Sequence, residues 1–92
     1  MSVRDIINQP VTRDDVARAT RVIVQTGSVS PLVLQRRISM PYSKAVRIIA
    51  MLEGAHIVTG EIEGIGRKVI IKNETIAVNA ALRRFNKGKS TK

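Results

Sequence analysis

The sequence predicts an α+β fold, in which three core helices are followed by a two-stranded β-hairpin and a C-terminal helix. Two observations predict it. Between residues 14 and 54, apolar side chains recur at the spacing of amphipathic helices. After residue 54, the pattern changes to short runs rich in β-branched residues, as in strands. The 92 residues suffice for one domain, which we expect at 14–72, between an N-terminal extension at 1–13 and a C-terminal helix and basic tail at 73–92.

The first core helix is expected at residues 14–26. Thr12 stands three positions before Asp15, and a Thr-x-x-acid pattern is typical of a capped helix start. Gly27 is placed to end the helix, because glycine readily adopts the left-handed conformation that closes helices. A short additional helix is expected at residues 2–9, ended by Pro10.

Two further helices are expected with a three-residue connector between them. Ser30 and Pro31 predict the start of the second helix, since serine caps helices and proline is tolerated at the first position. Pro41 disfavours helical geometry at the residue before it, so residues 39–41 form the connector. The third helix is expected from residue 42 or 43 to 53. Its predicted core residues are Ala45, Ile48, Ile49 and Leu52.

The rest of the chain is expected to hold the hairpin and the last helix. Residues 55–59 and 68–72 predict two antiparallel strands, joined by a loop with three glycines. Val78, Ala81, Leu82 and Phe85 fit one face of a helix that either closes the core or forms a dimer seam. The last seven residues are basic and expected to be disordered. The three-helix core with its hairpin makes a winged helix-turn-helix.

The composition excludes several classes of function. The chain has no cysteine and one histidine, so we expect no disulfide, no metal site and no cofactor. Gly88-Lys89-Ser90 resembles the end of a phosphate-binding loop, but the leading glycine is missing. Gly64-Ile65-Gly66 also lacks the last glycine of a dinucleotide fingerprint. We therefore expect no enzyme and no small-molecule substrate. No signal peptide or membrane span is expected, which predicts a cytoplasmic, nucleoid-associated protein without a membrane partner.

The charge of the chain favours a polyanionic partner. Sixteen Lys and Arg residues against seven Asp and Glu give a formal net charge of +9. A helix-turn-helix presents its second helix to the major groove of double-stranded DNA. We expect base contacts from Ser43, Lys44 and Arg47, which fall on the outward side of helix 42–54. A solvated helix face is the alternative for Lys44 and Arg47.

Phosphate contacts are expected from Arg36, Arg37, Arg67 and Lys68. For Arg36 and Arg37, plain solubility is an equal alternative. Arg67 lies at the base of the predicted hairpin, and its alternative is an ion pair with Glu61 or Glu63. These two glutamates also argue against a strongly basic hairpin.

Segment 30–70 carries a series of residues typical of one known family. They are Leu34-Gln35-Arg36, Ile38, Tyr42, Ala45, Arg47, Ile48-Ile49, Leu52-Glu53, Ala55, Ile57-Val58, Arg67 and Val69. In this series the chain resembles the gamma domain of FtsK-type chromosome-segregation DNA translocases. The resemblance implies a winged helix that reads a short, directional, G-rich DNA sequence with the residues at positions 43, 44 and 47. It also implies a recombinase-type protein partner.

The chain departs from the family pattern at five positions. The family's Gly, Asn, Arg, Glu and Gly are replaced here by Pro41, Ser43, Lys44, Ala50 and His56. Lysine lacks the bidentate fork of arginine, so the base preference is expected to differ from that of the family. The motor of the family's ATPases is missing from these 92 residues, which suggests a free-standing protein that uses the same reading surface.

The sequence thus predicts a non-enzymatic, sequence-specific double-stranded DNA-binding protein, acting as a transcription regulator or a DNA-orienting domain. The chief alternative is a protein-interaction module on a winged-helix scaffold, which contacts a recombinase or dimerises through residues 74–86. An RNA-binding basic protein is a third hypothesis, although an aromatic content of 2% argues against a base-stacking platform.

Overall fold

The computed structural model describes the backbone of residues 10–89 and the side chains of residues 10–87. This part of the chain holds four helices, α2 (Arg13–Thr26), α3 (Pro31–Ile38), α4 (Tyr42–Gly54) and α5 (Glu74–Lys89). The three predicted core helices are therefore confirmed to within a residue at each end. The helix expected at 2–9 lies outside the described residues. Disorder was expected from residue 86 onward, and this is wrong as far as Lys89, because α5 continues to that residue.

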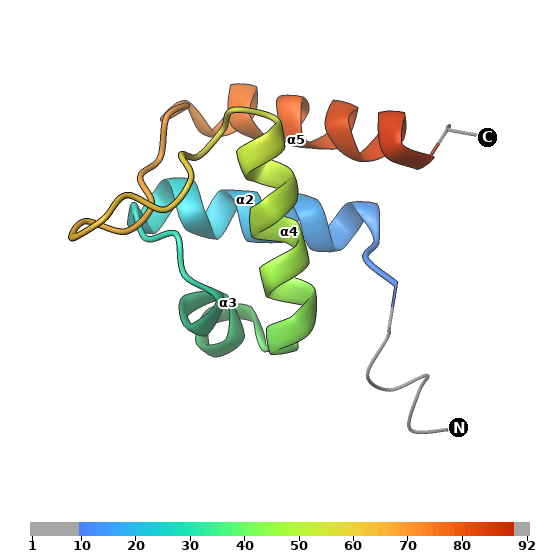
Figure 1. Cartoon of the computed structure of the whole chain (residues 1–92). Helices are drawn as coiled ribbons and strands as arrows, with labels where there is room; N and C mark the ends of the chain where they lie inside the picture. Colours follow the sequence, from blue (N-terminus) through green and yellow to red (C-terminus); the bar gives the residue numbers. More distant parts are fainter. Residues whose placement is uncertain (1–9, 90–92) are drawn as a thin grey trace.

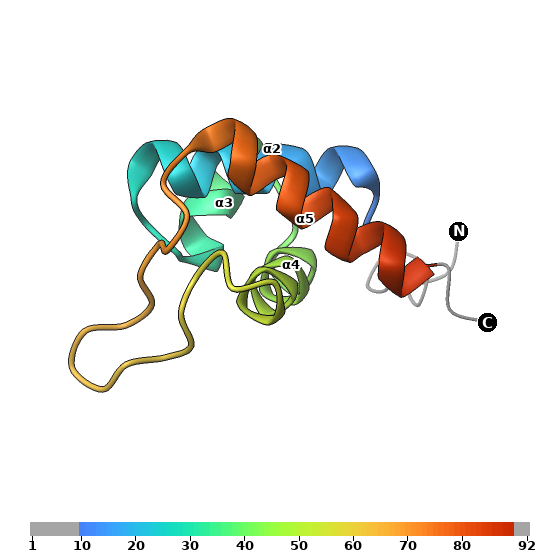
Figure 2. The same ribbon diagram turned by 90° about the horizontal axis from the view of Figure 1, so that it is seen from above.

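The helix axes run in two main directions, one shared by α2 and α5 and one followed by α4 (Figure 1). Helices α2 and α5 lie side by side, and α4 crosses them. Helix α3 packs on α4 near the N-terminal end of that helix. Residues 55–73, here called the return loop, lead from α4 back to α5 and project to one side of the helices (Figure 2).

Local signals at the helix ends explain where α2 begins and ends. The Thr12 hydroxyl accepts a hydrogen bond from the Asp15 amide at 3.1 Å, and the Asp15 carboxylate accepts one from the Thr12 amide at 3.0 Å. This reciprocal pair is a capping box, which satisfies two amides that the helix leaves open. At the other end Gly27 has a φ of 73° and donates its amide to the Ile23 carbonyl, as expected of a closing glycine.

The core takes apolar side chains from all four helices and from the return loop. The four residues of α4 that the sequence predicted to be buried are confirmed as core residues, each 3% exposed or less: Ala45, Ile48, Ile49 and Leu52. Helix α5 adds Ala77, Val78 and Ala81, so it closes the core of the monomer. The other core residues are Val16, Ala19, Ile23, Leu34, Met40, Ile57 and Val58.

The predicted β-hairpin is wrong, and with it the α+β class. Residues 10–89 contain no strand, only two isolated antiparallel bridges, Val58–Val69 and Ile62–Gly66. Regular antiparallel pairing requires alternating hydrogen-bonded pairs along both segments. Here the amides of Ile70 and Ile71 both donate to the carbonyl of Ile57, at 2.7 and 3.3 Å, so the pairing stops after a single bridge.

The backbone at the start of the return loop also opposes a strand. His56, which lies in the first predicted strand, has a φ of 61°. That left-handed conformation is incompatible with an extended segment. The described part of the chain is therefore all-helical, and the return loop takes the place of the predicted wing.

Candidate functional site

The turn between α3 and α4 sets how α4 is presented. Ser39 ends α3 in a left-handed conformation, with a φ of 54°, and its amide donates to the Leu34 carbonyl. Met40 is buried in the core and anchors the turn, and Pro41 precedes the first residue of α4. A short turn of this kind joins the two helices of a helix-turn-helix and leaves one face of the second helix open.

The exposed side of α4 carries part of the predicted base-contacting set. Ser43 and Arg47 lie one turn apart and are both exposed. Val46 and Ala50 are exposed on the same side. The face opposite to them is the one that enters the core. The exposed face of α4 therefore carries a hydroxyl, a guanidinium and two small apolar side chains.

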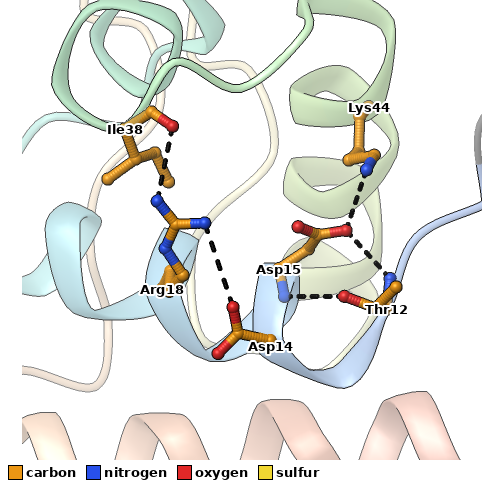
Figure 3. A network of polar contacts seen from close by, with 6 residues as sticks. All are labelled: Thr12, Asp14, Asp15, Arg18, Ile38 and Lys44. Carbon is orange, nitrogen blue, oxygen red and sulfur yellow. Dashed lines mark hydrogen bonds and ion pairs between the residues drawn. The ribbon is translucent and has the colours of Figure 1, made fainter.

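Lys44, the third residue of that set, does not lie with Ser43 and Arg47. Its ammonium is 2.9 Å from the Asp15 carboxylate of α2, and the two side chains are only 12% and 15% exposed (Figure 3). Asp15 also belongs to the capping box of α2. The pair thus ties the first turn of α4 to the first turn of α2, and the outward orientation expected for Lys44 is absent.

The pKa of the Asp15 carboxyl reflects these contacts. Burial raises this pKa, but the hydrogen bonds from Lys44 and Thr12, with the charge of Lys44, outweigh burial. The net result is a pKa below the usual range of an aspartate, so Asp15 is ionised at neutral pH.

The residues predicted to contact phosphates fall into two groups. Arg36 and Arg37 are exposed on the last turn of α3, and Lys68 is exposed on the return loop. Arg67, in contrast, donates to Glu53 of α4 at 2.7 Å and to the Thr59 carbonyl at 3.2 Å, while Glu61 lies 4.0 Å away. Its guanidinium fastens the return loop to α4, mainly through a glutamate that the sequence did not suggest.

A shallow pocket of about 350 Å³ lies beside the exposed face of α4. The start of α3, the Tyr42–Val46 side of α4 and the return loop around Arg67 surround it. Tyr42 is half exposed, as is Val46, so this side of α4 presents apolar surface next to the polar Ser43 and Arg47.

A second basic region joins Lys87, from the segment predicted to be a basic tail, to two arginines that the sequence analysis did not single out. Arg83, Arg84 and Lys87 of α5 line a hollow of about 650 Å³ together with Ala55. The Arg84 guanidinium lies over Gly54, close enough that a Cβ at this glycine would be 2.8 Å from it. The adjacent arginines were the available signal, but only the packing of α5 places them at the C-terminal end of α4.

Among residues 10–89, no group of acidic and histidine side chains could hold a metal ion, and no helix is long and apolar enough to cross a bilayer.

A family model for the FtsK gamma domain matches residues 13–72, which include α2, α3, α4 and nearly all of the return loop. The chain belongs to the FtsK gamma domain family. The resemblance seen in the sequence is thereby confirmed. Gamma domains form a family that binds DNA and is not catalytic. The helix-turn-helix character of this family agrees with the arrangement of α3 and α4. Searches of curated proteins and of solved structures give no match.

Proposed function

We propose that this gamma domain is a sequence-specific double-stranded DNA-binding protein that reads the major groove with α4. One observation carries the proposal. One face of α4 is buried in the core, and the opposite face exposes Ser43 and Arg47, which lie one turn apart. The formal net charge of +9 supports a polyanionic partner, and membership of a DNA-binding family supports DNA. A role as a regulator or as a DNA-orienting domain would follow from such reading.

The structure supports different roles for the predicted contact residues. Arg47 is suited to the O6 and N7 atoms of a guanine, and Ser43 to a base or a phosphate. Arg36, Arg37 and Lys68 are exposed and suited to phosphates. Lys44 and Arg67 are held in ion pairs, so base or phosphate contact by either would require its pair to open. We assign these two residues to positioning α4 and the return loop.

Replacing Arg47 with alanine tests the reading role of α4. Binding sites are first selected from random duplex DNA, and affinities are then measured on a selected site and on random duplex. Arg47→Ala is expected to cost about 1–3 kcal/mol on the selected site and to relax one base position. Arg21→Ala, at an exposed arginine of α2, is the matched control. Equal losses on selected and random duplex would remove Arg47 from base reading.

A protein-interaction module is the second candidate, and the return loop favours it. This loop exposes the apolar side chains of Ile62 and Ile65 beside Glu61 and Glu63, on an otherwise basic protein. Acidic side chains repel phosphates, whereas exposed apolar ones suit a protein surface. A recombinase or a second copy of the chain would be such a partner. A mobility-shift experiment on random duplex at low salt separates the candidates, since a module that binds only protein gives no shift.

A further inference from the structure

The exposure of Val46 is not explained by the packing of the domain. Its side chain is 42% exposed, whereas the larger apolar residues on the opposite face of α4 are 3% exposed or less. A single exposed valine is ordinary on a protein surface. Val46, however, follows Ser43 by three residues and so neighbours it on the exposed side of α4, whereas Arg47 points to the other side of Ser43. It is therefore an apolar site within the face that would meet base edges.

The Val46 side chain borders a hollow and is not covered by another element. It lines the shallow pocket bounded by Tyr42, the start of α3 and the return loop. Valine in a helix holds its two methyl groups in one strongly preferred rotamer. Little side-chain entropy is lost when such a group makes contact, so these methyls are a preorganised apolar surface.

The chemistry of the major groove identifies what this surface would recognise. Base edges there offer hydrogen-bond donors and acceptors, and a single apolar group, the C5-methyl of thymine. Contact between valine and a polar edge would strip water from that edge without replacing its hydrogen bonds, which is unfavourable. Contact with a methyl buries apolar surface on both sides, which is favourable. 5-Methylcytosine carries the same methyl group at the same ring position.

We infer that Val46 is a specificity-determining residue that selects a 5-methylpyrimidine, on either strand, within the base pairs that α4 reads. The inference rests on the proposed reading of the major groove by α4. In unmodified DNA it requires a T·A pair within the recognised sequence. The other exposed small residue of this face, Ala50, lies one turn further along and extends the apolar surface.

Removal of single methyl groups from the DNA tests this inference. In a selected site, each thymine is replaced in turn by deoxyuridine, which differs only by the missing methyl. Wild-type protein is expected to lose about fourfold in affinity at one thymine, the equivalent of about 0.8 kcal/mol for one buried methyl group. At that position, 5-methylcytosine should be bound more tightly than cytosine by a similar factor.

Val46→Ala should bind the thymine and deoxyuridine duplexes equally well. Its melting temperature should stay near that of the wild type, because the side chain is exposed. Ile76→Ala, at an exposed apolar residue of α5, is the matched control and should keep the wild-type discrimination.

The outcomes separate this inference from the proposed function. If selected duplexes are bound but no deoxyuridine replacement weakens binding, or no selected site contains thymine, the inference is overturned and DNA reading stands. An equal discrimination by wild-type protein and Val46→Ala also overturns it. If no duplex is bound at low salt, the proposed function itself fails. Loss of discrimination in Val46→Ala alone, with Ile76→Ala unchanged, supports the inference.

Discussion

The ion pair between Lys44 and Asp15 should contribute strongly to stability, and Asp15→Ala tests this. The carboxylate accepts hydrogen bonds from the Lys44 ammonium at 2.9 Å and from the Thr12 amide at 3.0 Å. Its loss removes half of the capping box, which costs about 0.5–1 kcal/mol. It also removes the carboxylate from the ammonium of Lys44, whose side chain is only 12% exposed, and this costs about 1–3 kcal/mol. We expect a total loss of about 1.5–4 kcal/mol in the free energy of unfolding.

The matched control is Asp14→Ala, one position earlier in the same helical turn. The Asp14 side chain is 77% exposed, and its carboxylate lies 3.9 Å from the guanidinium of Arg18. Figure 3 draws this pair beside the contacts of Asp15. Such a surface pair contributes about 0–0.5 kcal/mol. Urea unfolding followed by circular dichroism measures both variants, and the melting temperature of Asp15→Ala should be lower than that of the wild type by at least about 6 °C. If the two variants differ by less than about 0.5 kcal/mol, the pair is a surface contact and Lys44 is available to DNA.

The pH dependence of stability gives an independent test of the same pair. The pKa of Asp15 is lower in the folded protein than the ordinary value of about 3.9. Its contribution to stability is therefore present above the unfolded pKa and is lost as the pH falls through the folded pKa. The difference in unfolding free energy between wild type and Asp15→Asn should be largest near neutral pH and should shrink below about pH 4. A difference of equal size at pH 7 and pH 3 would contradict the assignment.

Three further predictions follow from the backbone and the packing. Ser39→Gly should raise the free energy of unfolding by about 0.5–1 kcal/mol, because Ser39 adopts a left-handed conformation, and a loss in urea unfolding would contradict this. Ala81→Leu should destabilise by about 1–3 kcal/mol, since Ala81 is fully buried, while Asn79→Leu on the exposed side should change stability by less than about 0.5 kcal/mol. Arg67→Gln should speed hydrogen exchange of the Thr59 and Lys68 amides, and unchanged exchange would mean that Arg67 does not fasten the return loop.

The helices could be predicted because their signals are local. Thr12, Asp15 and Gly27 act within a turn of the helix that they cap or close, and the structure contains the hydrogen bonds that their spacing predicts. The buried face of α4 followed from periodicity alone. Family membership could also be predicted, because the residues that carry it all lie within the matched segment 13–72.

The return loop and the ion pairs could not be predicted from local patterns. Short β-branched runs favour strands, but they do not reveal the left-handed backbone at His56 or the sharing of one carbonyl by two amides. Lys44 falls on the outer half of α4 by helical spacing. Only tertiary packing brings it to Asp15, which is 29 positions earlier in the sequence. The partner of Arg67 was missed for the same reason, since Glu53 belongs to α4.

The pairing of α2 with α5 determines the order in which the domain can mature during synthesis. The apolar stripe of α2, including Ala19 and Ile23, is made early, whereas Ala77 and Ala81 are made more than fifty residues later. Such distant contacts form slowly, because a long stretch of chain must close before they add stability. The face of α2 that packs on α5 therefore stays uncovered until the last helix has been made.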